Sequence, residues 1–134
     1  MLNTGNTSKN SDEKKNKKEL IRFLIAGFSA VGMDLISYNI LLNLLNYNIA
    51  KGLAFFLGTA IAYFVNKYWT FEKNEKSYRE ILKFGLLYSA TLIINIITNH
   101  YVLIASDFVF LAFLIATGIS AVINFLGQKF WVFK

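Results

Sequence analysis

Apolar residues gather into four long runs that are separated by short polar breaks. The first run extends from Phe23 to Leu45 and contains a single charged residue, Asp34. Its 23 residues are enough for a helix to cross a hydrocarbon core of about 30 Å at about 1.5 Å per residue. The other runs cover residues 49–66, 81–105 and 108–127. The pattern predicts an all-α membrane protein with four transmembrane helices.

The breaks between the runs predict how the four helices are connected. Asn46, Tyr47 and Asn48 form one short break, and Ser106 and Asp107 form another. The segment 67–80 between them is longer and carries charges of both signs. Because short connections join antiparallel neighbours, we expect two helical hairpins that are joined by one sizeable loop.

Each predicted hairpin ends in the same pattern of a lysine, an aromatic residue, a tryptophan, any residue and a phenylalanine. The first copy lies in NKYWTF at 66–71, and the second lies in NFLGQKFWVF at 124–133. Residues 20–73 and 81–134 align with an offset of 61 at their starts and 62 at their ends, so the second copy carries one inserted residue. Two helices per copy predict a parallel repeat, in which both hairpins enter the membrane from the same side.

Residues 1–19 are polar and contain almost nothing to bury, which predicts a disordered cytoplasmic tail ahead of a membrane domain at 20–134. Four lysines cluster just before the first apolar run: Lys14, Lys15, Lys17 and Lys18. A nucleic-acid patch is conceivable. Attraction to anionic lipid headgroups is the better interpretation because a membrane segment follows at once, and we expect no nucleic-acid partner.

Positive charge is distributed unevenly between the two sides of the predicted bundle. The tail, the middle loop and the C-terminal end hold 13 of the 14 Lys and Arg residues, and the short turns hold only Lys51. The positive-inside rule therefore predicts that both termini are cytoplasmic. It also places four aromatic residues at the cytoplasmic membrane interface: Trp69, Phe71, Trp131 and Phe133.

Composition excludes several classes of function. The chain has no Cys and one His, so disulfides, zinc–thiolate sites and pairs of catalytic histidines are excluded. It has neither a glycine-rich phosphate loop nor an evident nucleophile–base pair. We therefore expect no metal, no cofactor and no enzymatic activity.

Small and polar residues recur at helical spacing within the apolar runs. Ala54, Gly58, Ala62 and Asn66 are four residues apart, and their equivalents are Ala116, Ser120, Asn124 and Gln128. Further stripes on the first and third helices contain Asp34 and Asn95. Small residues at this spacing are typical of helix packing seams. The alternative is a polar axis, formed by Asp34, Asn66, Asn95, Asn124 and Gln128, around which all four stripes turn inward.

Asp34 stands about twelve residues into its predicted span, near mid-membrane. A charge at that depth costs roughly 2.5–3.5 kcal/mol on insertion scales. Asp34 must therefore be protonated, hydrogen-bonded, with Asn95 as the candidate partner, or paired with a cation. Its position is consistent both with a functional relay and with a structural role in fixing helix register.

Four cations lie one per helix at the predicted cytoplasmic ends, and we call them the cationic set: Arg22, Lys67, Lys83 and Lys129. Topology signalling alone accounts for them. If they surround the polar axis, they also form a site for a phosphate group, which Lys meets as a point charge and Arg with paired hydrogen bonds.

The chain resembles the GtrA-like family from about Leu20 to Lys134. Arg22-Phe23, the intramembrane Asp34 and the segments at 66–71 and 124–133 carry the resemblance. It implies a small four-helix protein of the bacterial inner membrane that flips a polyprenyl-phosphate-linked monosaccharide to the outer leaflet, where a separate glycosyltransferase uses the sugar. Ala62, Gln128 and Lys129 depart from the family's usual residues, which argues against equal substrate binding by the two halves.

Two other functions are compatible with the sequence. One is a non-transporting partner subunit that anchors or stabilises a glycosyltransferase. A small multidrug exporter also has four helices and a membrane carboxylate, but the strong charge bias and the cationic set disfavour it. Because a chain of this size encloses little volume, we expect a homodimer.

Overall fold

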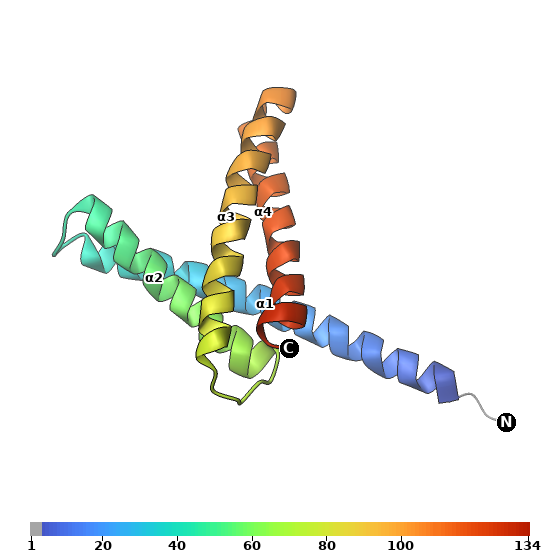
Figure 1. Cartoon of the computed structure of the whole chain (residues 1–134). Coiled ribbons are helices and arrows are strands. Elements are labelled where there is room, and N and C mark those ends of the chain that lie inside the picture. Colours follow the sequence, from blue (N-terminus) through green and yellow to red (C-terminus); the bar gives the residue numbers. More distant parts are fainter. Residues whose placement is uncertain (1–3) are drawn as a thin grey trace. The chain divides into compact units, whose positions relative to one another are not determined.

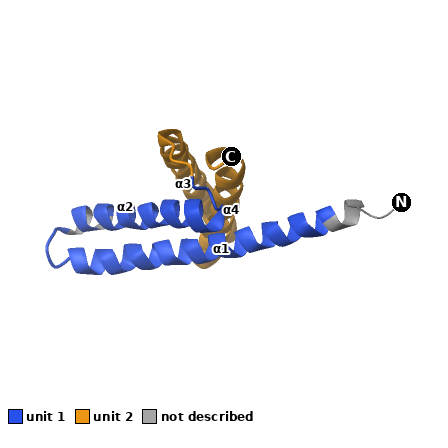
Figure 2. Cartoon of the chain, turned by 90° about the horizontal axis from the view of Figure 1, so that it is seen from below, with its two compact units in different colours: residues 1–74 blue, residues 75–134 orange. Residues whose placement is uncertain are grey.

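The computed structural model describes the backbone of residues 4–134 and the side chains of residues 8–134 apart from 47, 48 and 51. Every regular element in these residues is helical, which confirms the predicted all-α class. The elements are α1 (Thr4–Leu41), α2 (Tyr47–Val65), η1 (Asn66–Thr70), α3 (Tyr78–Ser106), α4 (Val109–Gly127) and η2 (Gln128–Val132). They form two compact units, Met1–Asn74 and Glu75–Lys134, and each unit is described by itself (Figure 1, Figure 2).

The first unit is a hairpin in which α1 and α2 lie side by side and antiparallel (Figure 2). Asn46 caps α2, because its side-chain oxygen accepts a hydrogen bond from the backbone N–H of Ile49 at 3.1 Å. Ala50, Ala54 and Ala62 on α2 are buried. Small side chains at this spacing let the two helix backbones approach closely, as the stripe predicted.

The second unit repeats the first with a tighter turn between α3 and α4. Asp107 ends α3 in the left-handed conformation (φ 52°), and α4 begins two residues later at Val109. Ala112 and Ala116, which are equivalent to Ala50 and Ala54 by the offset of 62, are buried in the same way. The expected hairpin turn at Ser106 and Asp107 is therefore confirmed to within a residue.

The helix boundaries locate the inserted residue of the second copy. The second helices begin 62 residues apart, at Tyr47 and Val109, and both contain 19 residues. In contrast, α1 ends at Leu41, whereas α3 continues to Ser106. The extra residue thus belongs to the end of α3 and the turn after it, and the terminal segments of the two copies remain in step.

Most of the large apolar side chains of both units point away from the protein. Phe28 is 79% exposed and Phe56 is 68% exposed. Three helical stretches are long and apolar enough to cross a membrane by length and composition: Ser8–Leu41, Tyr78–Ser106 and Val109–Val132. The side chains of residues 47, 48 and 51 in α2 lie outside the described set, so the fourth predicted span stays a prediction.

The structure corrects the expected disordered tail. Residues 1–3 lie outside the described part, but α1 already begins at Thr4 and continues without a break into the apolar run. Lys and Glu are good helix formers, and Glu13 with Lys17 and Lys15 with Glu19 are favourable pairs four residues apart. A low content of apolar residues therefore prevented a core here without preventing a helix.

Two further boundaries differ from the pattern. The first helix stops at Leu41 and not at Leu45, because residues 42–46 form the connection to α2. The predicted 67–80 loop is shorter than expected, since η1 continues to Thr70 and α3 begins at Tyr78. Apolar content alone did not reveal where the helical backbone ends.

Candidate functional site

Each hairpin ends in a widened helical turn that carries the repeated motif. The turns η1 and η2 continue α2 and α4 directly as five-residue π-helical segments. Phe71 N–H donates to the Asn66 carbonyl at 2.9 Å, and Phe133 N–H donates to the Gln128 carbonyl at 2.9 Å, so each bond spans five residues. Such single π-turns are frequent at functional sites. We call η1 and η2 the terminal turns.

A cation from the first helix of each hairpin binds its terminal turn in the same way. Arg22 donates to the Trp69 carbonyl at 2.7 Å, and Lys83 donates to the Trp131 carbonyl at 3.0 Å. The same two cations lie over the indole rings, at 5.2 Å and 5.9 Å from the ring centroids. Carbonyls at a helix end lack intrahelical partners, and these cations supply one.

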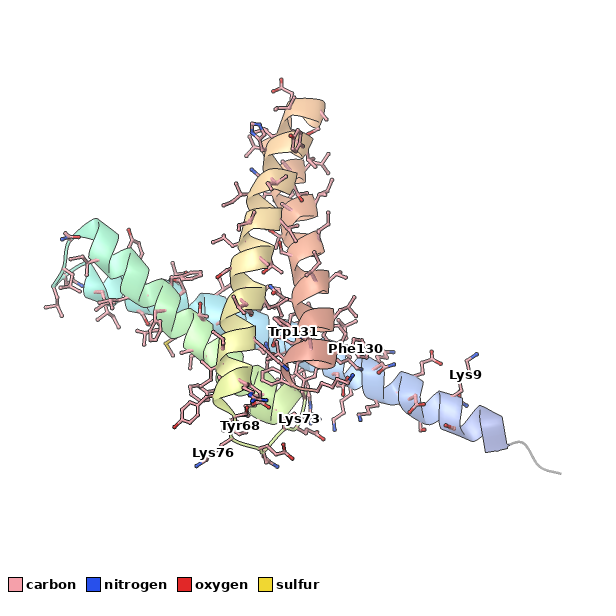
Figure 3. The ribbon with its side chains drawn as sticks, in the orientation of Figure 1. Lys9, Tyr68, Lys73, Lys76, Phe130 and Trp131 are labelled. Atoms are coloured by element: carbon pink, nitrogen blue, oxygen red, sulfur yellow. The ribbon has the colours of Figure 1, made fainter. Side chains whose placement is uncertain are left out.

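The other two members of the cationic set lie on the terminal turns themselves. Lys67 sits over the rings of Tyr63 and Tyr68, within 5.8 Å of each centroid. Lys129 sits over the equivalent rings of Phe125 and Phe130, also within 5.8 Å. Figure 3 labels three aromatic residues of the terminal turns, Tyr68, Phe130 and Trp131. The internal repeat therefore extends from sequence to individual side-chain contacts.

The cationic set nevertheless differs in how accessible its members are. Lys67 is only 2% exposed, and Arg22 makes an ion pair with Glu72 at 2.5 Å. Lys83 and Lys129 are half-buried. Of the predicted interface aromatics, Trp69 and Trp131 are exposed, whereas Phe71 and Phe133 are buried. The rings of Phe71 and Phe133 are therefore buried within the protein, and their place at a membrane interface stays a prediction.

The helix seam of the second unit is hydrogen-bonded. Thr91 on α3 donates from its hydroxyl to the side-chain oxygen of Asn124 on α4 at 3.0 Å. Ser120 donates to the Thr91 carbonyl at 3.3 Å. These contacts follow the predicted polar stripe, and they show that the stripe includes interhelical hydrogen bonds as well as small residues.

The same positions are filled differently in the first unit. By the two offsets, Thr91, Ser120 and Asn124 correspond to Ala30, Gly58 and Ala62. A Cβ atom on Gly58 would stand 2.8 Å from the Ala30 carbonyl oxygen and 3.1 Å from the Asp34 Cβ. Asp34 therefore lies in the α1–α2 seam beside Gly58, where any larger residue would require the backbones to move apart.

A buried amide stands at the start of each terminal turn. Asn66 is 1% exposed, and its side-chain oxygen accepts a hydrogen bond from the Thr70 hydroxyl at 3.1 Å. Gln128 is fully buried and faces Tyr88. Neither polar atom of the Gln128 amide completes a hydrogen bond of good geometry with the described residues. Buried amides without partners are rare because desolvation of each polar group is costly.

The family model for the GtrA/DPMS transmembrane domain matches residues 22–133. The chain belongs to this family. As a GtrA/DPMS domain with several apolar helices, it is a multi-pass membrane protein that takes part in membrane processes involving glycosylated lipids. Domains of this family are typically membrane subunits or flippases and not catalytic domains.

Two predictions about this GtrA/DPMS domain concern both units at once and stay predictions. Asp34 is half-buried on α1, and Asn95 is half-buried on α3, one turn beyond Thr91. Their hydrogen bond and the single polar axis each require a particular arrangement of the two hairpins.

No group of three His, Asp or Glu side chains able to hold a metal ion occurs within the described residues.

Sequence reasoning missed the importance of Glu72. This residue has a left-handed backbone (φ 53°), and its carboxylate binds both Lys18 at 3.0 Å and Arg22. Hydrogen bonds from Lys18 and Arg22 hold the pKa of Glu72 below its ordinary value. The offset of 62 pairs Glu72 with Lys134, and this reversal of charge between the copies is the sequence signal that could have singled out Glu72.

Proposed function

We propose that the protein translocates a polyprenyl-phosphate-linked monosaccharide across the bacterial cytoplasmic membrane for the glycosylation of cell-surface polysaccharide or teichoic acid. Family membership supports a role with glycosylated lipids in a membrane. The observation that carries the proposal is the close succession of cations and amides at the terminal turns. In the second unit, Lys83 binds the turn at Trp131, and the buried Gln128 lies three residues earlier.

This succession matches the chemistry of the substrate. A phosphate group requires cations at the membrane surface, and sugar hydroxyls require hydrogen-bonding groups deeper in the helix pair. The cationic set would receive the phosphate, while Asn66, Asn124 and Gln128 would bind hydroxyls. Asp34 and Asn95 would continue the polar axis toward mid-membrane. The prenyl chain would remain in lipid, beside the exposed apolar side chains.

The charge distribution supports an orientation with both termini in the cytoplasm. In that orientation the terminal turn of each hairpin lies at the cytoplasmic surface, the side from which the proposed substrate would be taken. The exposed Trp69 and Trp131 side chains would then lie among lipid headgroups. We include a homodimer and a separate glycosyltransferase as partners in this proposal.

A translocation assay in vesicles tests the function. The purified protein is reconstituted with a polyprenyl-phosphate hexose that carries a fluorescent group on the sugar, and an impermeant quencher reports the accessible fraction. We expect the protein alone to raise the accessible fraction, and we expect Asp34→Asn, Lys67→Ala and Lys129→Ala to slow it. Lys76→Ala is the matched control, because Lys76 is an exposed lysine in the connection between the two units (labelled in Figure 3). Full activity in all three variants would overturn the site assignment.

A second candidate is a non-transporting subunit that anchors a glycosyltransferase. The N-terminal part of α1 favours it, because residues 8–18 are helical and exposed and carry charges of both signs. A solvated helical arm of this kind is suited to binding another protein. The vesicle assay separates the candidates, since a pure anchor translocates nothing on its own and stimulates only the activity of the enzyme it binds.

A further inference from the structure

The two hairpins share one scaffold but differ in the polar groups near their terminal turns. Each position near one terminal turn has a counterpart near the other because the chain is a repeat, and every contact that differs lies within one unit. The differences concern the cations at the outer end, the amide at the start of the turn and the seam between the helices.

The first difference is an acid that is present in only one copy. In the first unit, the Glu72 carboxylate binds Lys18 and Arg22. The corresponding residues in the second unit are Lys134, Arg79 and Lys83, which are all cations. Counting side chains alone, these positions carry a formal charge of +1 in the first unit and +3 in the second. Glu19 and Glu80 occur in both copies and leave this difference unchanged.

Lys134 has the same position relative to its terminal turn in the sequence as Glu72 has in the first unit. Phe71 and Phe133 end the π-helical segments with the same five-residue hydrogen bond at 2.9 Å. Glu72 and Lys134 each follow directly. In the first unit the carboxylate already supplies the negative charge that the cations attract. The second unit presents the equivalent cations without that carboxylate, and Lys83 is half-buried there beside Trp131.

The second difference concerns the buried amide. Asn66 is hydrogen-bonded by Thr70, but the counterpart of Thr70 is Val132, which offers no hydroxyl to Gln128. The Gln128 amide is fully buried and both of its polar atoms lack a well-formed hydrogen bond within the described part of the chain. A buried amide of this kind gains most from a ligand that carries hydroxyl groups.

The third difference is the composition of the helix seam. The second unit has Thr91, Ser120 and Asn124, whereas the first unit has Ala30, Gly58 and Ala62 at these positions. The polar side chains begin one helical turn from Gln128 and extend away from the cationic end, since Asn124 and Ser120 precede Gln128 by four and eight residues. In the second hairpin, cations, a buried amide that faces Tyr88 and polar seam side chains thus follow one another. The equivalent seam positions of the first hairpin are Ala30, Gly58 and Ala62, with Asp34 beside Gly58.

We infer that, of the groups proposed above to meet the substrate, those of the second hairpin hold the headgroup of a phosphorylated lipid in the resting protein. In the first hairpin, Glu72 and Thr70 already make the contacts that a ligand would make. Lys83 and Lys134 bind the phosphate group, and Gln128 binds hydroxyls of the attached sugar. This inference rests on the proposed function for the identity of the lipid. It rests on the structure for the choice of hairpin.

The two tryptophans allow each hairpin to be observed separately. Trp69→Phe leaves Trp131 as the reporter of the second hairpin, and Trp131→Phe leaves Trp69 as the reporter of the first. Because Lys83 lies over the Trp131 ring, a phosphate that draws its ammonium group away changes the Trp131 emission. The full-length variants in nanodiscs are titrated with undecaprenyl phosphate, with undecaprenol as the phosphate-free control and with inorganic phosphate.

We expect undecaprenyl phosphate to change the emission of Trp131 but not that of Trp69, and undecaprenol to change neither. A response of Trp131 to inorganic phosphate alone would support the site and identify free phosphate as a second source of its ligand. Equal responses of both tryptophans, or a response of Trp131 to undecaprenol equal to that for the phosphate, would overturn the inference.

Exchanging residues between the copies gives matched variants. Lys134→Glu rebuilds the acid of the first hairpin in the second and is expected to weaken binding of undecaprenyl phosphate by about tenfold or more, the loss of one charge-assisted contact. Glu72→Lys makes the reverse change and leaves the Trp131 response unaltered. An unchanged affinity of Lys134→Glu, with its helical content intact, contradicts the phosphate assignment.

The amide is tested by a variant that supplies the missing hydroxyl. Val132→Thr gives Gln128 the partner that Thr70 gives Asn66, so it is expected to weaken binding of undecaprenyl-phosphate glucose while leaving binding of undecaprenyl phosphate unchanged. Equal effects on both lipids contradict the role of Gln128.

If the Trp131 response is selective but vesicles show no translocation, the proposed function fails and the choice of hairpin stands. If vesicles show translocation but both tryptophans respond equally, the choice of hairpin fails and the proposed function stands.

Discussion

Gly58 lies where the two helices of the first hairpin approach each other closely, and Gly58→Ala tests how tightly that hairpin is packed. The added Cβ would lie 2.8 Å from the Ala30 carbonyl oxygen and 3.1 Å from the Asp34 Cβ. Neither atom is the end of a flexible side chain, so the helices themselves must move apart. Overpacking of this kind costs about 1–3 kcal/mol, and the better helix propensity of Ala returns at most about 1 kcal/mol.

Gly118→Ala is the matched control, because Gly118 is also inside a helix and its added Cβ would meet no atom within 4 Å. We expect it to leave stability unchanged or to raise it by up to about 1 kcal/mol. The assay is the free energy of unfolding of both variants in mixed detergent micelles, followed by helical circular dichroism. Equal stability changes for the two variants would refute the close packing of α1 against α2 at Asp34.

Two further predictions concern the polar contacts. Because the pKa of Glu72 is lowered in the folded protein, its ion pairs stabilise the fold above the ordinary pKa of 4.5 and are lost as the pH falls through the folded pKa. When the free energy of unfolding is measured against pH, Glu72→Gln should therefore lose less stability at acid pH than the unaltered protein does. A double-mutant cycle of Thr91→Ala and Asn124→Ala should give a coupling of about 0.6 kcal/mol, and no more than about 1.7 kcal/mol, in the free energy of unfolding; a value of zero contradicts the interhelical hydrogen bond.

Much of the fold was readable from the sequence because it depends on periodicity and on the repeat. The runs of apolar residues predicted four helices, and the start of α2 and of α4 follows the offset of 62. The tail was predicted wrongly because composition measures the ability to form a core and not the ability to form a helix. α1 begins at Thr4 since no tertiary contact is needed where Lys and Glu pairs support the helix.

The candidate site was predicted at the level of residue types but not of contacts. A count of positive charges showed four cations at helix ends, yet it did not show that Arg22 is bound by Glu72 or that Lys67 is buried. Both facts depend on the widened terminal turns. Apolar and aromatic residues at 66–71 and 128–133 predict only that a helix continues, and nothing in their spacing distinguishes a π-turn from an α-turn.

The terminal turns keep their structure whichever residue follows them. The contact of Arg22 or Lys83 with a tryptophan carbonyl holds each turn against the first helix of its hairpin without using the residue that follows the turn. That following residue is therefore free to change from Glu72 to Lys134 without loss of the turn. A hairpin that keeps the acid satisfies its own cations, and a hairpin that loses it must find an anion elsewhere. In a membrane surface the anions at hand are lipid phosphates. Under the inference drawn above, the change from Glu72 to Lys134 is therefore one of three differences that would let the second hairpin hold a headgroup.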